Sequence, residues 1–457
     1  MTRSLPRSSP SAHSYDADGV LAFVEAVEAA PRLELHGLVV VHGGEVLAEG
    51  WWAPYTADRL HLLYSVSKSV TSTAVGLAVG EGLVDLDATV LSFFPELDAE
   101  VTDPRSRSIR VRHVLAMASG HTAETVDLAE ELDPVDLVRG FLLLPPQEEP
   151  GSVFAYNQPC TFVAGAIVQR VSGQSLTEYL RPRLLDPLGI GEVAWLRDAS
   201  GRELGYSGLH ATTEAAAVLG QLYLQEGRWG DRQLLPAGWV AEASHAHVPT
   251  QEEGGPDWQR GYGFQFWVSQ HGFRADGAYG QFSLIVPEHD LVVALTGQTN
   301  DAQTLLSLVW EHLVPAVGRG STAEADARLA ERLAALALPA LSGAEPVLGE
   351  YAPVDGSEVR SLTGVEVSGG DGGWTLTLEE GGGRLVVAVG SEGWTVGGAV
   401  AASGGAASAD ATAVDIAFLE TPHRLHLVLA PADGSFTARW ETAPLHDGPL
   451  GAVRAPR

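Results

Sequence analysis

Hydrophobic positions in the first 315 residues follow two spacings, one typical of strands and one typical of helices. Residues 35–41 and 45–51 are apolar runs on either side of His42-Gly43-Gly44, which predicts a β-hairpin. Residues 66–82 are rich in Ala, Val and Leu at helical spacing and predict a buried helix. Further helices are expected at 17–30, 109–118, 160–172, 175–182, 212–226, 236–245 and 302–314, and further strands at 262–268, 279–286 and 291–296.

Strands are therefore expected at the beginning and the end of this part of the chain, with helices between them. This order favours an α/β (α+β) fold. In it, helices flank a mainly antiparallel sheet, and a helical subdomain is inserted midway.

The composition changes after about residue 318, where residues 323–338 predict a connecting helix. The chain then becomes rich in glycine, and its short alternating segments are typical of an all-β barrel or sandwich. Strands are expected at 374–378, 384–389, 424–429 and 436–441, and a mobile loop of small residues at 398–410. We expect a first domain over 1–318, a helical linker over 319–344 and a β domain over 345–457.

The chain carries a formal net charge of −30, with a pI of about 4.7. This charge argues against partners such as nucleic acid or an anionic membrane surface. No run approaches the roughly 18 apolar residues of a membrane helix. The first twenty residues also hold no apolar signal segment. We therefore expect a cytoplasmic protein without a membrane partner.

The sequence shows none of the common cofactor motifs. It has no Cys/His metal spacing, no Walker loop and no Gly-x-Gly-x-x-Gly at the start of a helix. We therefore expect no metal and no cofactor. The single cysteine, Cys160, excludes an intramolecular disulfide and is expected in the core.

Of the 28 lysine and arginine residues, only one is a lysine, Lys68. Unlike arginine, lysine can lose its proton near neutral pH when it is buried. Ser65 stands three residues earlier, on the same face of the predicted helix, so Lys68 is placed to activate it as a nucleophile. A GC-rich coding sequence would also deplete lysine, so Ser-x-x-Lys gains weight only from its surroundings.

Two other segments offer the groups that such a nucleophile needs. Tyr156 stands just before a predicted helix, and a tyrosine beside a lysine can relay a proton. Asn157 and Gln158 follow it and are candidate amide contacts to a substrate. Gly277 and Ala278 lead into a predicted strand, where glycine lets a substrate lie close to the backbone. The N–H groups of Ala278 and of the nucleophilic serine are candidate oxyanion donors.

The order and spacing of these motifs resemble the serine β-lactamase-like hydrolases. This family includes penicillin-binding proteins, class C β-lactamases, family VIII esterases, D-aminopeptidases and 6-aminohexanoate-dimer hydrolases. The resemblance covers roughly residues 20–315 and implies that Ser65 is acylated, Lys68 is the general base and Tyr156 is the proton relay. Some relatives carry a lipocalin-like barrel after this region. The supporting stretches include Leu63-Tyr64-Ser65-Val66-Ser67-Lys68-Ser69, Arg112-His113-Val114-Leu115, Ser119-Gly120-His121 and Gly280-Gln281.

The sequence departs from the family pattern at two motifs. The second motif is usually Tyr-x-Asn, but Gln158 occupies the last position. The third is usually Lys-Thr-Gly or His-x-Gly, but here Ala275 takes the place of the cation and Asp276 follows it. In β-lactamases and DD-peptidases that triplet helps to hold the substrate carboxylate, so the resemblance is closer to the esterases and 6-aminohexanoate-dimer hydrolases. Arg274 either replaces the missing charge or points into solvent.

The sequence thus predicts a serine hydrolase that cleaves an ester or amide bond of a small molecule or short peptide through a Ser65 acyl-enzyme. Transfer of the acyl group to an amine or alcohol, as in an acyltransferase or peptide cyclase, is a second possibility. A third is a binding module without activity, because a fold alone does not establish catalysis. The sequence does not indicate an oligomeric state.

Overall fold

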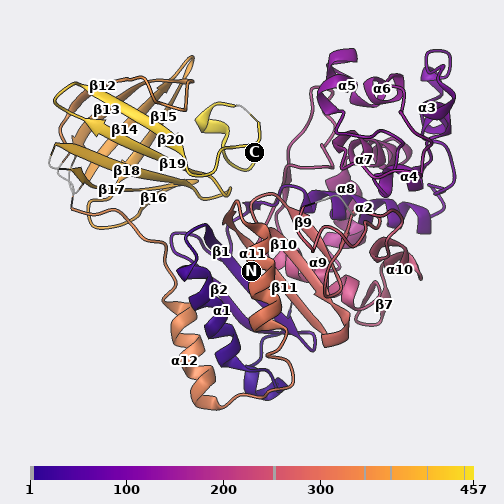
Figure 1. Cartoon of the computed structure of the whole chain (residues 1–457), viewed down its shortest axis with the longest axis horizontal. Helices are drawn as coiled ribbons and strands as arrows, with labels where there is room; N and C mark the ends of the chain where they lie inside the picture. The colour runs from indigo at the N-terminus through magenta and orange to yellow at the C-terminus, as the bar shows by residue number, and fades with distance from the viewer. Residues whose placement is uncertain (1–4, 251–253, 344–345, 371–372, 409, 447) are drawn as a thin grey trace.

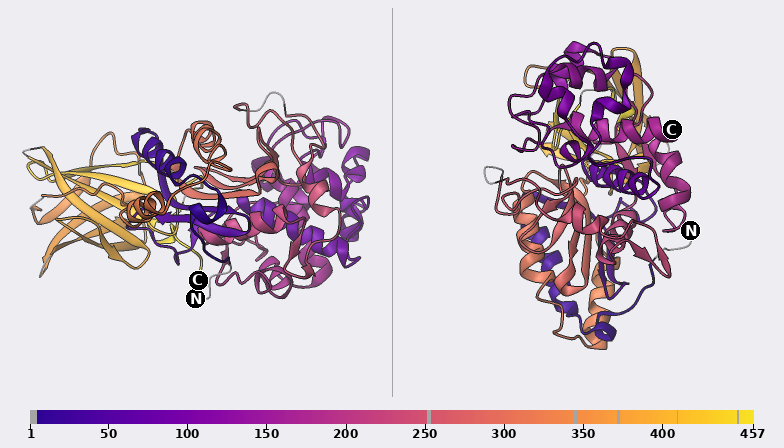
Figure 2. Two further views of the ribbon diagram at one scale, coloured as in Figure 1. Left: turned by 90° about the horizontal axis from the view of Figure 1, so that it is seen from below. Right: turned by 90° about the vertical axis from the view of Figure 1, so that its right-hand side faces the viewer.

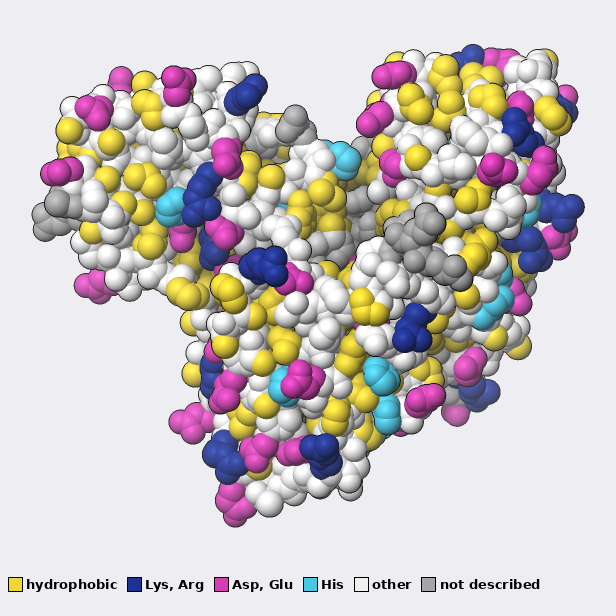
Figure 3. Space-filling view, in the orientation of Figure 1, with side chains coloured by type: hydrophobic (Ala, Val, Ile, Leu, Met, Phe, Trp, Pro, Cys, Tyr) yellow, Lys and Arg dark blue, Asp and Glu magenta, His cyan; other side chains and the backbone are white. Residues whose placement is uncertain are grey.

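The computed structural model describes residues 5–250, 254–343, 346–370, 373–408, 410–446 and 448–457. A central sheet lies in the middle of an elongated molecule, with a helical region at one end and a β-barrel-like domain at the other (Figure 1 and Figure 2). The surface is hollowed between these two ends (Figure 3). The expected boundary between linker and β domain, at 344–345, lies outside the described residues.

The central sheet is antiparallel throughout, as the sequence predicted. Its strand order is β2-β1-β11-β10-β9-β8, so the first and last long strands of this region pair with each other. The bounds are β1 (Leu33–His42), β2 (Glu45–Trp51), β8 (Trp267–Val268), β9 (Phe273–Gly277), β10 (Gln281–Val286) and β11 (Leu291–Thr299).

Alternation along the strands separates two hydrophobic cores. In β1, Val39 and Val41 face the core shared with α2 (Val66–Gly80) and α9 (Thr213–Leu224). Their neighbours Leu38 and Val40 face the opposite core. That second core is closed by α1 (Ala17–Ala29), α11 (Ala302–Leu308) and α12 (Ala323–Ala334) (Figure 1). Because successive strand residues point to opposite faces, one apolar strand can supply both layers.

The helical subdomain is inserted between β2 and β8, and α7 (Gln158–Ser172) packs against α2 within it. Its other helices are short: α3 (Pro104–Ser108), α4 (Val111–Leu115), α5 (Val126–Leu132), α6 (Leu137–Leu143), α8 (Leu176–Leu180) and α10 (Trp239–Ser244). Three small strands, β3 (His61–Leu62), β4 (Ala194–Trp195) and β5 (Leu209–Ala211), form a separate sheet. No helix among the described residues is long and apolar enough to span a bilayer.

The prediction of a strand at 262–268 is mostly wrong, because only its last two residues form a strand, β8. Gln265 has a φ of 65°, which interrupts an extended strand. Its buried side chain accepts a hydrogen bond from Thr161 (2.6 Å) and donates to the carbonyl oxygens of Val114 (3.0 Å) and Leu115 (2.8 Å). Long-range polar contacts therefore fix this segment in an irregular form.

The C-terminal domain is a nine-stranded, nearly closed barrel-like sheet, in agreement with the all-β prediction. Among the strand pairs formed by the described residues of this domain, β12–β20 is parallel and the others are antiparallel. The sheet comes close to closing into a barrel where the Gly404 N–H donates a hydrogen bond to the carbonyl oxygen of Gly390 (2.9 Å). Apolar side chains fill the interior of this barrel-like domain. The strands are β12 (Gly349–Pro353), β13 (Leu362–Gly370), β14 (Gly373–Glu380), β15 (Gly383–Val389), β16 (Thr395–Gly397), β17 (Val400–Ser408), β18 (Ala411–Phe418), β19 (Arg424–Ala430) and β20 (Ser435–Trp440).

The prediction of a mobile loop over 398–410 is wrong for most of that range. Residue 409 lies outside the described residues. The segment forms β17, which pairs with both β16 and β18. Its small residues serve packing, because a Cβ at Gly404 would lie 2.4 Å from the Trp374 ring. A strand that passes this close to an indole needs glycine rather than a larger residue.

Candidate active site

Ser65 lies at the start of α2 and remains partly exposed, whereas the helix behind it is almost entirely buried. The preceding residue, Tyr64, has a φ of 48°, an uncommon conformation for a bulky residue. The Ser67 hydroxyl donates to the Tyr64 carbonyl oxygen across this bend. The sharp entry into α2 therefore presents Ser65 at the end of a rigid element.

Lys68 lies one helical turn beyond Ser65, and its amine is fully engaged. Nζ donates to Ser65 Oγ (2.9 Å), to the side-chain oxygen of Gln158 (2.5 Å) and to the carbonyl oxygen of Tyr206 (2.8 Å). These three acceptors match the three hydrogens of an ammonium group. After loss of one proton, two N–H bonds can remain on Gln158 and Tyr206 while the lone pair faces Ser65.

The environment of Lys68 favours the loss of a proton from its amine. Lys68 is only 1% exposed, and burial lowers the pKa of its amine to about 7. The carboxylates of Glu124 and Asp276 act in the opposite direction, but the cost of burying an ammonium group dominates. A substantial neutral fraction therefore exists near pH 7.

Tyr156 precedes α7 and brings its ring beside Lys68, whose Nζ lies 4.8 Å from the ring centroid. Burial raises the pKa of Tyr156, and a hydrogen bond with Ser65 partly offsets this, so the phenol stays protonated at neutral pH. The ring stacks on Trp267 (5.8 Å between centroids) and meets Tyr262 edge-on (6.2 Å). These aromatic contacts hold the hydroxyl at the serine.

The two amides after Tyr156 have different places in the structure. Gln158 is partly exposed, and its carbonyl oxygen faces Lys68. Asn157 is completely buried, and its Oδ1 accepts from the N–H (3.1 Å) and the hydroxyl (3.0 Å) of Thr125. The oxygen of Asn157 thus holds Thr125 inside the protein, while its Nδ2 makes no hydrogen bond with the described residues. Its role as a donor to the substrate stays a prediction.

Gly277 and Ala278 lie at the end of β9, beside the chain that leads to Ser65. A Cβ at Gly277 would lie 2.3 Å from the carbonyl oxygen of Leu63, so the end of β9 packs tightly against the chain leading to Ser65. Ala278 follows in the turn after β9 and is partly exposed. The close approach permitted by Gly277 places the residue before Ala278 against Leu63, two residues before Ser65. The Ala278 N–H as an oxyanion donor stays a prediction.

Arg274 neither replaces the missing cation nor points into solvent. Its guanidinium is 0% exposed and pairs with Asp276 (2.9 Å), while Nη1 donates to Ser269 Oγ (2.7 Å) and to the carbonyl oxygen of Asp257 (2.8 Å). Burial raises the pKa of Asp276, and Arg274 opposes that rise. The third motif thus contributes a buried ion pair instead of a free cation.

Two contributors to the Lys68 environment were not identified from the sequence. Tyr206 accepts a hydrogen bond through its backbone carbonyl, which any residue type would supply, and its ring centroid lies 5.7 Å from Lys68 Nζ. Glu124 accepts hydrogen bonds from the N–H groups of Gln158, Thr125 and Val126. It thereby fixes the start of α7, beside which Lys68 and Tyr156 meet.

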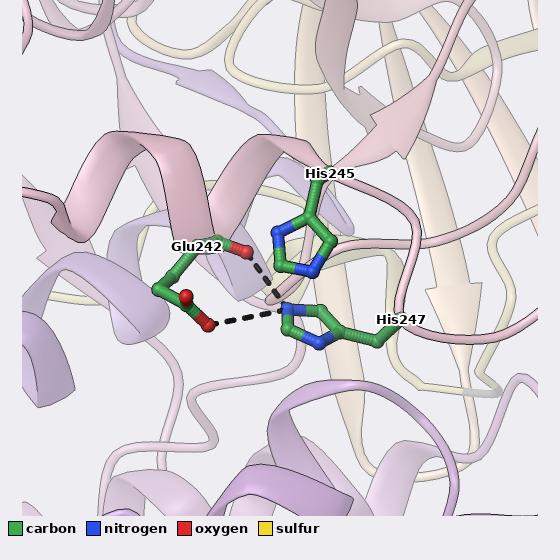
Figure 4. A group of neighbouring side chains, drawn as sticks. All are labelled: Glu242, His245 and His247. Carbon is green, nitrogen blue, oxygen red and sulfur yellow. Dashed lines mark hydrogen bonds and ion pairs between the residues drawn. The ribbon is translucent and has the colours of Figure 1, made fainter.

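A separate group, Glu242, His245 and His247, places three possible metal ligands within 4.8 Å of one another (Figure 4). The His247 nitrogen that faces the Glu242 carboxylate, Nε2, donates to the Glu242 carbonyl oxygen (2.8 Å). A carbonyl only accepts, so this nitrogen carries its hydrogen and is not a free ligand atom here. We assign no metal to this group.

The antiparallel sheet, the inserted helices and the Ser65, Lys68 and Tyr156 cluster define a protein of the serine β-lactamase-like class, as the motifs predicted. The profile of the Beta-lactamase family matches residues 25–312. The chain belongs to this family.

Known relatives and structures are consistent with this membership. The 6-aminohexanoate-dimer hydrolase of Paenarthrobacter ureafaciens is 31% identical over 220 residues, which cover 44% of this chain and 55% of that protein. Esterase EstB of Burkholderia gladioli is 28% identical over 214 residues, covering 41% and 54%. The chain thus spans about half the length of these curated relatives.

Some solved structures match most of the chain. The octameric penicillin-binding protein homologue from Pyrococcus abyssi has a TM-score of 0.50 and 15% identity, and the match covers 90% of this chain and 96% of that one. At this identity the likeness concerns the fold alone. Its coverage extends into the C-terminal domain.

Proposed function

We propose that this protein is a serine hydrolase that cleaves an ester or amide bond of a small molecule or short peptide through an acyl-enzyme on Ser65. The observation that carries the proposal is the buried Lys68 amine, 2.9 Å from Ser65 Oγ, with its pKa lowered to about 7. A serine hydroxyl becomes an effective nucleophile when a neighbouring base accepts its proton. Lys68 has both the position and the protonation state for this role.

In the proposed reaction, Ser65 Oγ bonds to the substrate carbonyl carbon while its proton moves to neutral Lys68. The carbonyl oxygen becomes an oxyanion, stabilised by the backbone N–H groups of Ser65 and Ala278. Tyr156 gives its proton to the leaving alcohol or amine and regains one from Lys68, as the carbon–leaving group bond breaks. Water then attacks the ester of Ser65 by the same proton route, which releases the acid and restores the enzyme.

The charges around Ser65 bear on the substrate class. The third motif has no free cation, and the charged side chains that act on Lys68 are the carboxylates of Glu124 and Asp276. A substrate recognised through its own carboxylate would meet repulsion here. We therefore favour neutral or amine-bearing esters and amides. The names of the two curated relatives, an esterase and a 6-aminohexanoate-dimer hydrolase, support the ester or amide bond but not the charge of the substrate.

A fluorophosphonate probe tests the proposal directly. We expect one covalent adduct, mapped to Ser65 by intact and peptide mass spectrometry, and its loss in Ser65→Ala. Lys68→Arg is the matched control, because arginine keeps the charge but does not act as a base at neutral pH. If the folded protein forms no adduct, a binding module on this fold becomes the better explanation.

Product analysis then separates hydrolysis from transfer. Once a substrate is found in ester and amide libraries, we expect the free acid as the product. Formation of an amide with an added amine acceptor, in preference to the acid, would instead identify an acyltransferase with the same acyl-enzyme.

A further inference from the structure

Two loops of the C-terminal barrel lie against the chain on both sides of the candidate oxyanion site. The loop between β18 and β19 accepts a hydrogen bond at Glu420 O from Leu62 N (2.8 Å), three residues before Ser65. The chain after β20 accepts one at Ala443 O from the Tyr279 hydroxyl (2.7 Å). The barrel therefore contacts both backbone segments that carry the expected oxyanion donors.

His423, between these contacts, is 1% exposed and has a defined tautomer. Its Nδ1 lies 2.9 Å from the carbonyl oxygen of Thr442, which only accepts, so Nδ1 carries the hydrogen. Nε2 is then the acceptor, and the Tyr64 hydroxyl donates to it at 2.6 Å. The hydroxyl of Tyr64 is thus bound to the C-terminal domain.

His423 also packs against Tyr279. The ring centroids of Tyr64, Tyr279 and His423 lie 5.5 to 5.9 Å apart in edge-on pairs. Tyr64 immediately precedes Ser65, and Tyr279 immediately follows Ala278. The three rings therefore connect the two backbone positions whose N–H groups would hold the oxyanion.

Both tyrosines have left-handed backbone conformations, with φ of 48° for Tyr64 and 65° for Tyr279. Such conformations in bulky residues persist only where the surrounding structure holds them. The hydrogen bond to His423 and the ring contacts supply that support. Without them, each tyrosine can relax, and the neighbouring N–H group would turn with it.

We propose that His423, a residue of the C-terminal barrel, is a positioning residue that holds the Ser65 and Ala278 N–H groups in the geometry that binds the oxyanion. This inference rests on the proposed function. It gives the barrel a part in catalysis without any contact with the substrate. Small displacements at a reacting centre have large effects on rate, which makes the inference testable.

The test compares variants that remove the Tyr64–His423 hydrogen bond from either side. His423→Phe keeps a ring but no acceptor, and Tyr64→Phe removes only the hydroxyl. We expect each to slow fluorophosphonate labelling of Ser65 and ester kcat by about tenfold or more, with little change in KM, since loss of one oxyanion donor costs about 10² to 10³ in rate. The double variant should be no slower than the slower single variant, because both changes remove the same bond.

Rescue and a matched control separate positioning from general destabilisation. His423→Gln returns an acceptor near the place of Nε2 and should recover part of the rate. His426→Phe alters another barrel histidine, whose Nδ1 pairs with Asp415 (2.6 Å), and should leave labelling unchanged. Thermal unfolding of each variant checks the fold, and Tyr64→Phe decides the question if His423→Phe does not fold.

The outcomes distinguish this inference from the proposed function. If the wild-type protein forms no Ser65 adduct, the proposed function fails. If it is labelled and both Tyr64→Phe and His423→Phe react at the wild-type rate, only the positioning role is wrong. Independent, additive effects of the two substitutions would also overturn it.

Discussion

The pH dependence of activity should report the protonation of Lys68. The fall of its pKa from 10.5 to about 7 corresponds to about 5 kcal/mol in favour of the neutral amine. About half of the Lys68 side chains are then neutral at pH 7, against roughly one in 3,000 for an ordinary lysine. Because only the neutral amine can accept the Ser65 proton, kcat/KM should rise as pH increases through about 7.

Glu124→Gln perturbs this titration without removing a hydrogen-bond acceptor. The glutamine oxygen can still accept from backbone N–H groups, as the Glu124 carboxylate does from Gln158. The lost negative charge had raised the pKa of Lys68, so the acid limb should move to lower pH. Asp276, the other carboxylate that raises the pKa of Lys68, remains in place and limits the shift of the acid limb.

The assay is kcat/KM between pH 5 and about 9 on an ester substrate found with the library, normalised to the concentration of folded protein. Lys68→Arg serves as the control and should lose about 10² to 10⁴ in rate, because it lacks the base. The reasoning is refuted if the acid limb stays at the same pH in Glu124→Gln, or if it persists in Lys68→Arg.

Three further predictions concern turnover and stability. Ser65→Ala should abolish turnover while the thermal midpoint changes little, because Ser65 is partly exposed; loss of the fold or retained activity would contradict this. Gly277→Ala should cost about 1 to 3 kcal/mol in urea unfolding and reduce activity, since its Cβ would lie 2.3 Å from Leu63 O; wild-type behaviour would contradict the packing. Burial lowers the pKa of both His210 and His423 to about 4, so their contribution to stability is complete above pH 6.5 and is lost toward pH 4. Urea midpoints should therefore fall between pH 7 and 4.5, and each of His210→Phe and His423→Phe should reduce that fall.

The local chemistry of the site could be predicted because it depends on short spacings. Ser65 and Lys68 share one helical face, and the structure places their side chains within hydrogen-bond distance. Tyr156 required the family pattern in addition, since nothing near it in the sequence identifies the distant Lys68 as its partner. Its catalytic role, like that of Ala278, stays a prediction. The fold class followed from the order of the elements. That Leu38 and Val39 face opposite cores was visible only in the structure, because residues 35–41 form an apolar run in the sequence, apart from His36 and Gly37.

The sequence by itself determined the serine–lysine pair, the antiparallel sheet with its helical insertion and the all-β C-terminal part, because residue spacing and local conformation encode all three. Only the tertiary structure decided that Arg274 is buried against Asp276, that residues 400–408 form a strand, and that His423 meets Tyr64. The Tyr64–His423 bond joins residues 359 positions apart. Arg274 and Asp276 are close in sequence, but the guanidinium is also held from another segment, by the carbonyl oxygen of Asp257. Several also use backbone carbonyls, which are the same in every residue type and leave no mark in the sequence.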